Sequence, residues 1–408
     1  MKHGIQLFIF INLCVSVASA ALSQSLSDEE WREDLIFIEQ AIREHHPNPF
    51  YVSLEENFQD MMENLNKNLP DLEDHEILSE MSRIVASLHD GHTAIRGGFQ
   101  FLTGQYPFDL YYFEDGIFVI GASADLADII GAKLISIDQN TAEDVFTAVT
   151  KVTPHDNEMT LKERTPDLMM SPEVLHSLGI TPVRDRAHFT FLSRDDYLFT
   201  VNLAPRPFDT IRFSYDTSVG TNPLSRRNRG RNYWHQYIES SKTLYVQYNS
   251  VRDAADESIK DYFGRVAQIA ATSDIERVVL DLRFNGGGND FLNRPVAEWV
   301  ESSPLVIQGR FFVIIGRGTY SAAQKLVTRL EASGVVLVGE PTGGSPNHFG
   351  DAIELRLPNS GITLTVSKIF HTGATGETRR TINPDVPVPV FSNGYFTGRD
   401  AALELIQQ

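Results

Sequence analysis

Cysteine is almost missing from this chain. Of its 408 residues only Cys14 carries a thiol, and it lies close to the N-terminus. A single cysteine cannot build a disulfide framework inside one chain. The sequence beyond residue 20 therefore offers no disulfide, no thiol nucleophile and no thiolate metal site.

Positive charge is scarce as well. Lysine and arginine total 35 against 54 acidic residues, a formal net charge of −19. Such a surface favours solubility and repels the phosphate backbone, so a nucleic-acid partner is not expected. The basic run "RRNRGR" is the exception. We interpret it as a solvated loop, with an anion site for a substrate carboxylate as the alternative, built from Arg226, Arg227, Arg229 and Arg231.

Long apolar runs are confined to the N-terminus. Lys2 and His3 precede "IQLFIFINLCVSV", and the segment closes with "ASA" at Ala20. A basic start, a short apolar stretch and a small-x-small end are typical of a secretory signal peptide, and the stretch is too short for a stable membrane span. We predict that residues 1–20 are removed and that the protein is exported, either periplasmic or secreted, without stable membrane insertion.

Metal-binding motifs are also absent: the chain contains neither "HExxH" nor a Cys/His cluster. No metal or cofactor is therefore expected.

Residues 21–98 are predicted to form an N-terminal helical domain. Ser27 and Glu30 have the spacing of a capping box, and apolar residues then recur at helical intervals. Two further helices are predicted near 54–69 and 75–88, the last ending before "HDGHT".

Residues 99–206 change to a β-rich pattern. "YPFDLYYFEDGIFVIGAS" and "AHFTFLSRDDYLFTVNLA" each predict a hairpin. "GAKLISIDQNTAEDV" resembles part of a PDZ domain, so a PDZ-like domain is expected. Residues 207–236 are rich in Pro, Arg, Asn and Gly and are predicted to be a linker.

Residues 237–408 alternate strand and helix. The predicted strands are "KTLYVQYNSV", "IERVVLDLRFNGGG", "RFFVIIGRGTY" and "VVLVGEPTGG". This alternation predicts a parallel sheet with helices packed on it, and ligands bind beyond the carboxyl ends of such strands. The "NGGG" loop and Ser321 both lie at these ends. A serine there either caps the helix that follows or acts as a nucleophile.

Four motifs carry a family resemblance. In order they are "DGHT", "LDLRFNGGGN", "GTYSAAQ" followed by "GEPTGG", and "INPDVPV". Together they resemble the serine peptidase family that includes the C-terminal processing (tail-specific) peptidases, the tricorn core protease and the interphotoreceptor retinoid-binding protein. The resemblance implies a multi-domain α/β chain: a helical cap, a PDZ-like β-rich domain and a crotonase- or ClpP-like α/β catalytic domain.

The resemblance implies that Ser321 is the nucleophile. A helix N-terminus favours the developing negative charge, and glycines let backbone N–H groups come close. The amide of Gly286 or Gly287, with that of Ala322, is predicted to form an oxyanion hole.

The identity of the general base separates two branches of the family. Tail-specific members use a lysine, but Ser345 stands at that position here, and Lys325 is interpreted as a surface residue. The tricorn-type branch uses a histidine from the segment matching "DGHT", which points to His92. Imidazole titrates near neutrality and suits the task. His348 is the alternative base.

The group that orients His92 is left open by the sequence. The tricorn pattern has a serine just before its histidine, where this chain has Gly91. Asp90 is adjacent, and Glu377 is the nearest acid upstream of the final "PD" segment.

The predicted function is an exported serine peptidase acting on peptides or proteins. A non-catalytic binder of peptides or apolar ligands is the alternative, because a fold does not guarantee a reaction. Ester or other acyl substrates are a second alternative. The oligomeric state is not indicated.

Overall fold

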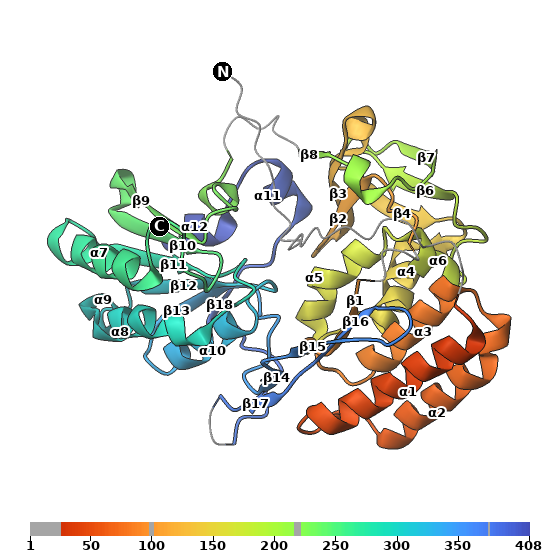
Figure 1. The fold of residues 1–408 in the computed structure, drawn as a ribbon. Coiled ribbons are helices and arrows are strands. Elements are labelled where there is room, and N and C mark those ends of the chain that lie inside the picture. Colours follow the sequence, from red (N-terminus) through yellow and green to blue (C-terminus); the bar gives the residue numbers. More distant parts are fainter. Residues whose placement is uncertain (1–25, 98–101, 216–221, 374–375) are drawn as a thin grey trace.

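A computed structural model describes residues 26–97, 102–215, 222–373 and 376–408. The predicted signal peptide, residues 1–20, lies outside the described residues. Figure 1 shows the C-terminal α/β elements on one side, with the helical and β-rich elements together on the other. Among the described helices, none has the length and apolarity needed to cross a bilayer.

Three helices form the first part of the chain: α1 (Asp28–His45), α2 (Glu55–Asn68) and α3 (Asp74–Ala86). The capping box is confirmed, because the Glu30 amide donates to Ser27 Oγ at 3.3 Å and the Ser27 amide donates to the Glu30 carboxylate at 2.8 Å. The predicted helices 54–69 and 75–88 correspond to α2 and α3. Their apolar faces pack into one core.

A hairpin from the C-terminal half completes that core. It consists of β15 (Ile353–Arg356) and β16 (Thr363–Val366), and β16 pairs antiparallel with β1 (Ala94–Arg96). Leu364 and Val366 lie in the core with the helices. The helical part is therefore not made from residues 21–98 alone, because the apolar face of the hairpin fills part of its interior.

The second part is a seven-stranded antiparallel sheet with helices packed on it. Its strands are β2 (Phe108–Phe113), β3 (Gly116–Ser123), β4 (Lys133–Ile137), β5 (Asn140–Thr141), β6 (Ala187–Leu192), β7 (Leu198–Leu203) and β8 (Phe213–Tyr215); its helices are α4 (Ala142–Val149), α5 (Glu158–Leu168) and α6 (Pro172–Ser177). Strand β8 pairs with β3. Part of the predicted linker 207–236 therefore belongs to this sheet.

The third part is built on a six-stranded sheet in the order β18-β13-β12-β11-β10-β9. The strands are β9 (Tyr233–Ile238), β10 (Thr243–Tyr248), β11 (Arg277–Asp281), β12 (Phe311–Ile315), β13 (Val336–Gly339) and β18 (Val386–Pro387). All neighbours from β10 to β18 are parallel, and β9 is an antiparallel edge strand. The predicted parallel sheet is confirmed.

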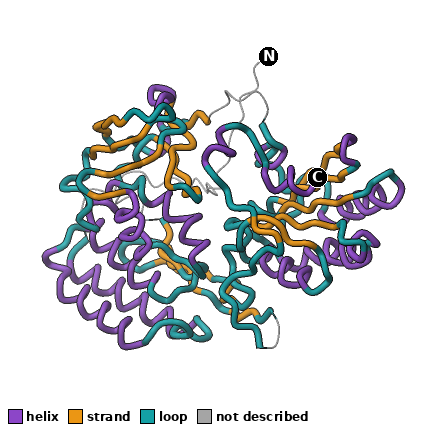
Figure 2. Tube along the Cα trace, turned by 180° about the vertical axis from the view of Figure 1, so that it is seen from behind, coloured by secondary structure: helices purple, strands orange, loops and turns teal. Residues whose placement is uncertain are grey.

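Helices cover both faces of this sheet, as Figures 1 and 2 show. One face packs against α7 (Ile259–Thr272), α8 (Arg294–Ser302) and α10 (Ala322–Glu331), and the other against α12 (Ala401–Ile406). Every residue of β10 is buried, as expected for a parallel strand covered on both sides. The remaining short elements are α9 (Pro304–Ile307), α11 (Ser392–Phe396), β14 (His348–Gly350) and β17 (Ile369–His371).

The loops that follow β11, β12 and β13 meet at one edge of the sheet, because the carboxyl ends of parallel strands share an edge. The amide of Tyr320 donates to the Asn285 carbonyl at 3.0 Å, and the amide of Gly344 donates to the Thr319 carbonyl at 3.0 Å. Three loops distant in sequence are thus bonded around the start of α10.

Candidate active site

Ser321 stands immediately before α10 in an unusual backbone conformation. Its φ is 52° and its ψ is −124°, and its side chain makes no capping hydrogen bond. The capping interpretation is therefore wrong for this serine. A non-glycine residue at such φ costs about 1–3 kcal/mol and persists only where its surroundings hold it. The amide of Lys325 donates to the Ser321 carbonyl at 3.1 Å, so the helix begins directly at the strained residue.

The structure brings His92 to Ser321. The Nε2 atom of His92 lies 3.0 Å from Ser321 Oγ, within hydrogen-bond reach. The imidazole ring stacks near Tyr320, with centroids 4.7 Å apart, and near His348 at 5.9 Å. The side chain of His92 is 16% exposed. An alcohol and an imidazole that are distant in sequence therefore meet in a largely enclosed place.

Asp90 holds the loop that carries His92. Its carboxylate accepts hydrogen bonds from the His92 amide at 2.9 Å and the Thr93 hydroxyl, and lies 3.2 Å from His46 Nε2. Burial opposes its charge, but these partners outweigh burial and hold the pKa of Asp90 below its ordinary value. Asp90 lies 4.0 Å from His92 Nδ1, too far for a hydrogen bond. Asp90 therefore hydrogen-bonds to the loop backbone, and it acts on the ring only through its charge.

Strand β16 fixes the same loop from the other side. The Thr365 hydroxyl donates to the His92 carbonyl at 2.8 Å, and the Ser367 amide donates to the Thr93 hydroxyl at 3.0 Å. The hairpin β15–β16, which comes from the C-terminal half of the chain, therefore helps to hold the loop that carries His92.

The second ring nitrogen of His92 faces a residue that sequence reasoning missed. Nδ1 lies 3.1 Å from Tyr320 Oη, and Tyr320 Oη donates to Asp156 Oδ1 at 3.1 Å. The Gly91 amide also donates to Asp156 Oδ1, at 2.7 Å. Tyr320 stood beside the predicted nucleophile in "GTYSAAQ", but nothing in the sequence pointed to Asp156.

The electrostatics of the site favour neutral imidazole. Burial lowers the pKa of His92 most strongly; Asp156 and Asp90 oppose this effect, and Arg164 and Arg96 add to it. A histidine that is unprotonated at neutral pH can accept a proton from an alcohol.

The "NGGG" loop packs directly against the serine. Gly287 has φ +102°, and a Cβ there would stand 2.7 Å from Ser321 Cβ. Its amide donates to Asn285 Oδ1 at 3.0 Å, so it is not a free donor. This removes Gly287 from the predicted oxyanion hole. Among the described residues, the amides of Gly286 and Ala322 have no hydrogen-bond acceptor, and these two remain the candidate donors.

The alternative base does not contact the serine. His348 Nδ1 lies 2.9 Å from the Ser345 carbonyl, and its ring packs beside His92. Burial lowers the pKa of His348 to about 4. His348 therefore packs beside His92 and does not act on Ser321 directly.

Glu377 does not orient His92. Its carboxylate pairs with Arg379 at 2.6 Å and accepts that residue's amide at 2.8 Å. These hydrogen bonds lower the pKa of Glu377 to about 2. The prediction for Glu377 was wrong, because a neighbouring arginine two residues on holds the side chain.

Both residues considered for a lysine dyad have other partners. Lys325 Nζ pairs with Asp290 at 2.6 Å, and the buried Ser345 hydroxyl donates to the Arg380 carbonyl at 2.7 Å. Within the described part of the chain, neither of these side chains hydrogen-bonds to the Ser321 hydroxyl.

The basic run does not form one anion site. Arg226 donates to the Tyr395 carbonyl at 2.7 Å and lies over that ring, and Arg227 donates to the Asn222 carbonyl at 2.6 Å. Arg229 lies 3.5 Å from the centroid of the Phe284 ring, and Arg231 is exposed. Three guanidinium groups with three separate partners do not converge on a shared carboxylate, so the alternative interpretation of this run is not supported.

Comparison with known proteins rests on the fold. No family model matches the sequence, and no curated protein matches it. Among solved structures, mature CPAF matches with a TM-score of 0.66 at 13% identity, over 93% of this chain and 96% of that chain. The fold is similar to that of mature CPAF. Mature CPAF complexed with lactacystin matches with a TM-score of 0.65 at 12% identity, over 93% of this chain and 98% of that chain.

A third match is a photosystem II D1 C-terminal processing protease, with a TM-score of 0.43 at 13% identity, over 91% of this chain and 98% of that chain. The likeness to CPAF extends over nearly the whole length of both proteins. It therefore supports the predicted multi-domain α/β fold with its helical, β-rich and α/β parts.

Two groups of side chains among the described residues have metal-ligand chemistry: Asp90, His92 and Asp156, and His75, Glu76 and His176. Several of their ligand atoms already make hydrogen bonds within the protein, whereas Asp156 Oδ2 has no partner among the described residues. His75 Nε2 lies 2.9 Å from His176 Nδ1, and the Glu76 carboxylate accepts the Glu73 amide at 2.8 Å.

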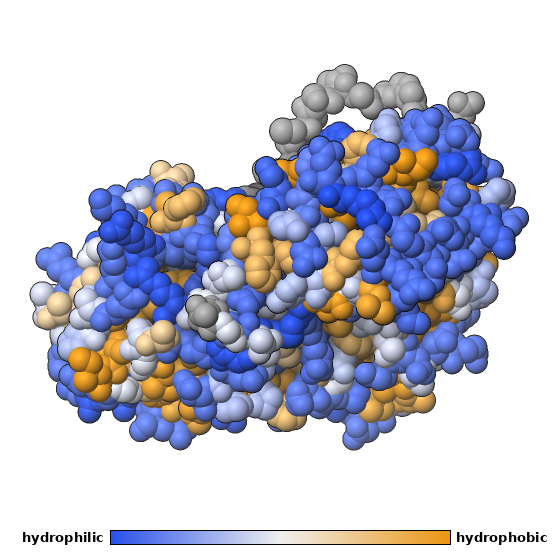
Figure 3. All heavy atoms as spheres, turned by 90° about the horizontal axis from the view of Figure 1, so that it is seen from below, coloured by the Kyte–Doolittle hydropathy of each residue, from blue (hydrophilic) through white to orange (hydrophobic). Residues whose placement is uncertain are grey.

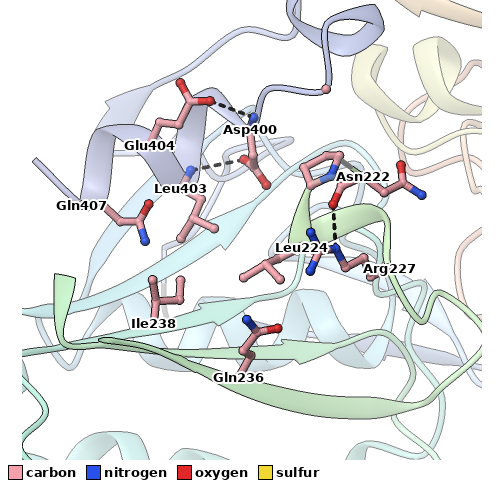
Figure 4. A pocket seen from close by; sticks show the side chains of 11 residues that line it. Asn222, Leu224, Arg227, Gln236, Ile238, Asp400, Leu403, Glu404 and Gln407 are labelled. Atoms are coloured by element: carbon pink, nitrogen blue, oxygen red, sulfur yellow. Dashed lines mark hydrogen bonds between the residues drawn. The ribbon is translucent and has the colours of Figure 1, made fainter. Parts of the chain in front are cut away.

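A pocket separate from this site lies between β9 and α12. It is lined partly by Leu224, Arg227, Ile238 and Leu403, which Figure 4 shows around a common space, and it contains no residue of the Ser321–His92 cluster. The face of the molecule in Figure 3 is mostly hydrophilic, with apolar side chains in scattered groups.

Proposed function

We propose that this protein is a serine peptidase that cleaves peptide bonds through an acyl-enzyme. The observation that carries the proposal is the 3.0 Å contact between Ser321 Oγ and His92 Nε2, made where the serine stands in a strained conformation at the start of α10. A nucleophile within hydrogen-bond reach of its base at a helix N-terminus is the arrangement that acyl transfer needs.

The proposed reaction uses two proton transfers. Ser321 Oγ attacks the peptide carbonyl carbon while His92 Nε2 takes the hydroxyl proton. The amides of Ala322 and Gly286 donate hydrogen bonds to the oxyanion; one such donor is worth about 2.7–4 kcal/mol. His92 then gives its proton to the leaving amine as the C–N bond breaks. Water next attacks the ester, His92 takes its proton and returns it to Ser321, and the acid product leaves.

The contacts of the candidate bases support one branch of the family that the sequence resembles. Lys325 is paired with Asp290 and Ser345 replaces the dyad lysine, whereas His92 contacts the nucleophile. We infer the histidine-dependent, tricorn-type arrangement. The complex of mature CPAF with lactacystin makes that compound a reasonable first inhibitor to test here.

Export is part of the proposal and is supported by the first twenty residues of the sequence. N-terminal sequencing of the exported protein should begin at Ala21, and retention of residues 1–20 would contradict it.

Peptide hydrolysis tests the proposal directly. We expect the wild type to cleave a fluorogenic peptide library and Ser321→Ala to lose at least 1,000-fold in kcat/KM, because the nucleophile is removed. Lys325→Met is the matched control and should stay within about twofold, since its amine pairs with Asp290. Equal cleavage by the wild type and Ser321→Ala would refute the proposal. Binding of apolar ligands without any cleavage would favour the non-catalytic alternative.

A further inference from the structure

The proton on the imidazole of His92 has to be on a particular nitrogen. Nε2 faces Ser321, and it can accept the hydroxyl proton only if the neutral ring carries its hydrogen on Nδ1. The hydrogen on Nδ1 needs an acceptor, because a buried donor without one is costly. The atom in reach is Tyr320 Oη, 3.1 Å away.

We propose that Tyr320 and Asp156 are positioning residues that hold His92 in the tautomer with hydrogen on Nδ1 and stabilise its imidazolium form. The proposal rests on the function proposed above. It assigns a continuous hydrogen-bonded chain from Ser321 through His92 and Tyr320 to Asp156, which joins the α/β, helical and β-rich parts of the protein.

The carboxylate sets the direction of this chain. A carboxylate oxygen accepts hydrogen bonds, and the phenol hydrogen of Tyr320 points to Asp156 Oδ1, 3.1 Å away. The phenol oxygen is then left to accept from His92 Nδ1–H. Burial raises the pKa of Tyr320 well above its ordinary value, so the phenol keeps its hydrogen. Asp156 is itself buried, and its Oδ2 has no hydrogen-bond partner among the described residues.

The ring of Tyr320 is held in place by its neighbours. It stacks on the imidazole with an interplanar angle of 24°, and the Arg164 guanidinium lies 4.6 Å from its centroid. Arg164 is anchored in turn by donating to the carbonyls of Gly91 and Pro154, each at 2.9 Å. Because the ring is held on both sides, its hydroxyl oxygen stays next to His92 Nδ1. A fixed acceptor at this nitrogen favours the tautomer with hydrogen on Nδ1.

Gly91 makes the room that the phenol occupies. A Cβ at this position would overlap Tyr320 Oη and would stand 3.1 Å from Asp156 Oδ1. A serine here, as in the tricorn pattern, would require the phenol of Tyr320 to move. The position of the Tyr320 hydroxyl beside His92 therefore depends on the absence of a side chain at Gly91.

Four charged groups act on the pKa of His92. Asp156 and Asp90 raise it, whereas Arg164 and Arg96 lower it, and the low-pKa ring of His348 packs alongside. Asp156 is the strongest of the groups that raise it. Removing its charge, or the phenol that links it to the ring, should lower the pKa of His92.

Kinetics of Tyr320→Phe and Asp156→Asn provide the first test. Each variant should lose about 10- to 100-fold in kcat with KM changed less than threefold, because substrate contacts are intact. The acid limb of the kcat/KM profile should move to lower pH. Tyr215→Phe is the matched control: it also removes a tyrosine–aspartate hydrogen bond of 3.1 Å, to Asp109 in the β-rich part, and should leave the acid limb in place. An unmoved acid limb in both site variants would overturn the proposal.

Nitrogen NMR of ¹⁵N-histidine protein supplies a readout that does not need turnover, with His92 assigned from a His92→Gln spectrum. Hydrogen on Nδ1 of neutral His92 in the wild type, and a shift toward Nε2 in Tyr320→Phe, would support the proposal. Hydrogen on Nε2 in the wild type, or the same tautomer populations in both proteins, would overturn it. If the expected tautomer appears in a wild type that cleaves no peptide, the positioning role stands and the proposed function fails.

Discussion

Replacing Gly287 with alanine tests how tightly the loop before α8 supports the nucleophile. The residue has φ +102°, and an ideal Cβ there would lie 2.7 Å from Ser321 Cβ, 2.8 Å from the Ala322 nitrogen and 3.0 Å from the Tyr320 carbonyl oxygen. Two of these neighbours are backbone atoms at the start of a helix, which cannot move away independently. The substitution therefore has a conformational cost and a steric cost.

The two costs can be sized separately. A side chain at an unfavourable positive φ costs about 1–3 kcal/mol. Overpacking against a well-fixed neighbour costs about 1–3 kcal/mol more. The total of about 2–6 kcal/mol is large against the usual 5–15 kcal/mol of a folded domain. Relief of the overlap would also displace Ser321, and because a misplacement of about 1 Å can cost about 100-fold in rate, we expect at least a tenfold fall in kcat.

Urea unfolding and peptide hydrolysis, measured at a temperature where both variants are folded, give the two readouts. Gly309→Ala is the matched control, since Gly309 has φ +64° and no atom within 4 Å of an added Cβ. It should lose only the conformational part, about 1–2 kcal/mol, and keep the wild-type kcat. The reasoning is refuted if Gly287→Ala loses no more stability than Gly309→Ala and hydrolyses peptide at the wild-type rate.

Two further predictions concern His348 and Thr365, which contact His92. Burial lowers the pKa of His348 to about 4, whereas the unfolded value is near 6.5. Its neutral form therefore contributes stability that is complete above about pH 6.5 and is lost as the pH falls to about 4. The loss amounts to about 3 kcal/mol. In His348→Gln the unfolding free energy should therefore fall about 3 kcal/mol less between pH 7 and pH 4, and identical pH slopes in urea titrations would count against it. Thr365→Val removes the hydroxyl that donates to the His92 carbonyl at 2.8 Å and should cost about 1–3 kcal/mol with reduced kcat. Unchanged unfolding and turnover in that variant would mean that β16 does not hold the loop.

Features governed by local pattern could be predicted from the sequence. The capping box at Ser27, the three helices that follow and the parallel sheet all depend on neighbouring residues or on regular spacing, and each is confirmed. The meeting of His92 and Ser321 was predicted from a resemblance of ordered motifs, and the structure places them 3.0 Å apart.

Features that depend on long-range pairing could not be predicted. The hairpin of β15 and β16 joins the helical core through pairing with β1, and no periodicity in the sequence records such a partner. The neighbour of His92 Nδ1 depends on where two loops cross, so Tyr320 and Asp156 were missed. Glu377 failed as a prediction because its carboxylate is paired with Arg379. Gly287 failed because the side chain of Asn285 takes its amide.

The central claim is that His92 activates Ser321, and the rate of covalent labelling measures it most directly. Fluorophosphonate should modify a single site, and peptide mass spectrometry should place the adduct on Ser321. The account predicts a rate constant that rises with pH through the titration of His92 and falls at least 100-fold in His92→Gln. An adduct on another residue, or equal rates for the wild type and His92→Gln, would contradict it.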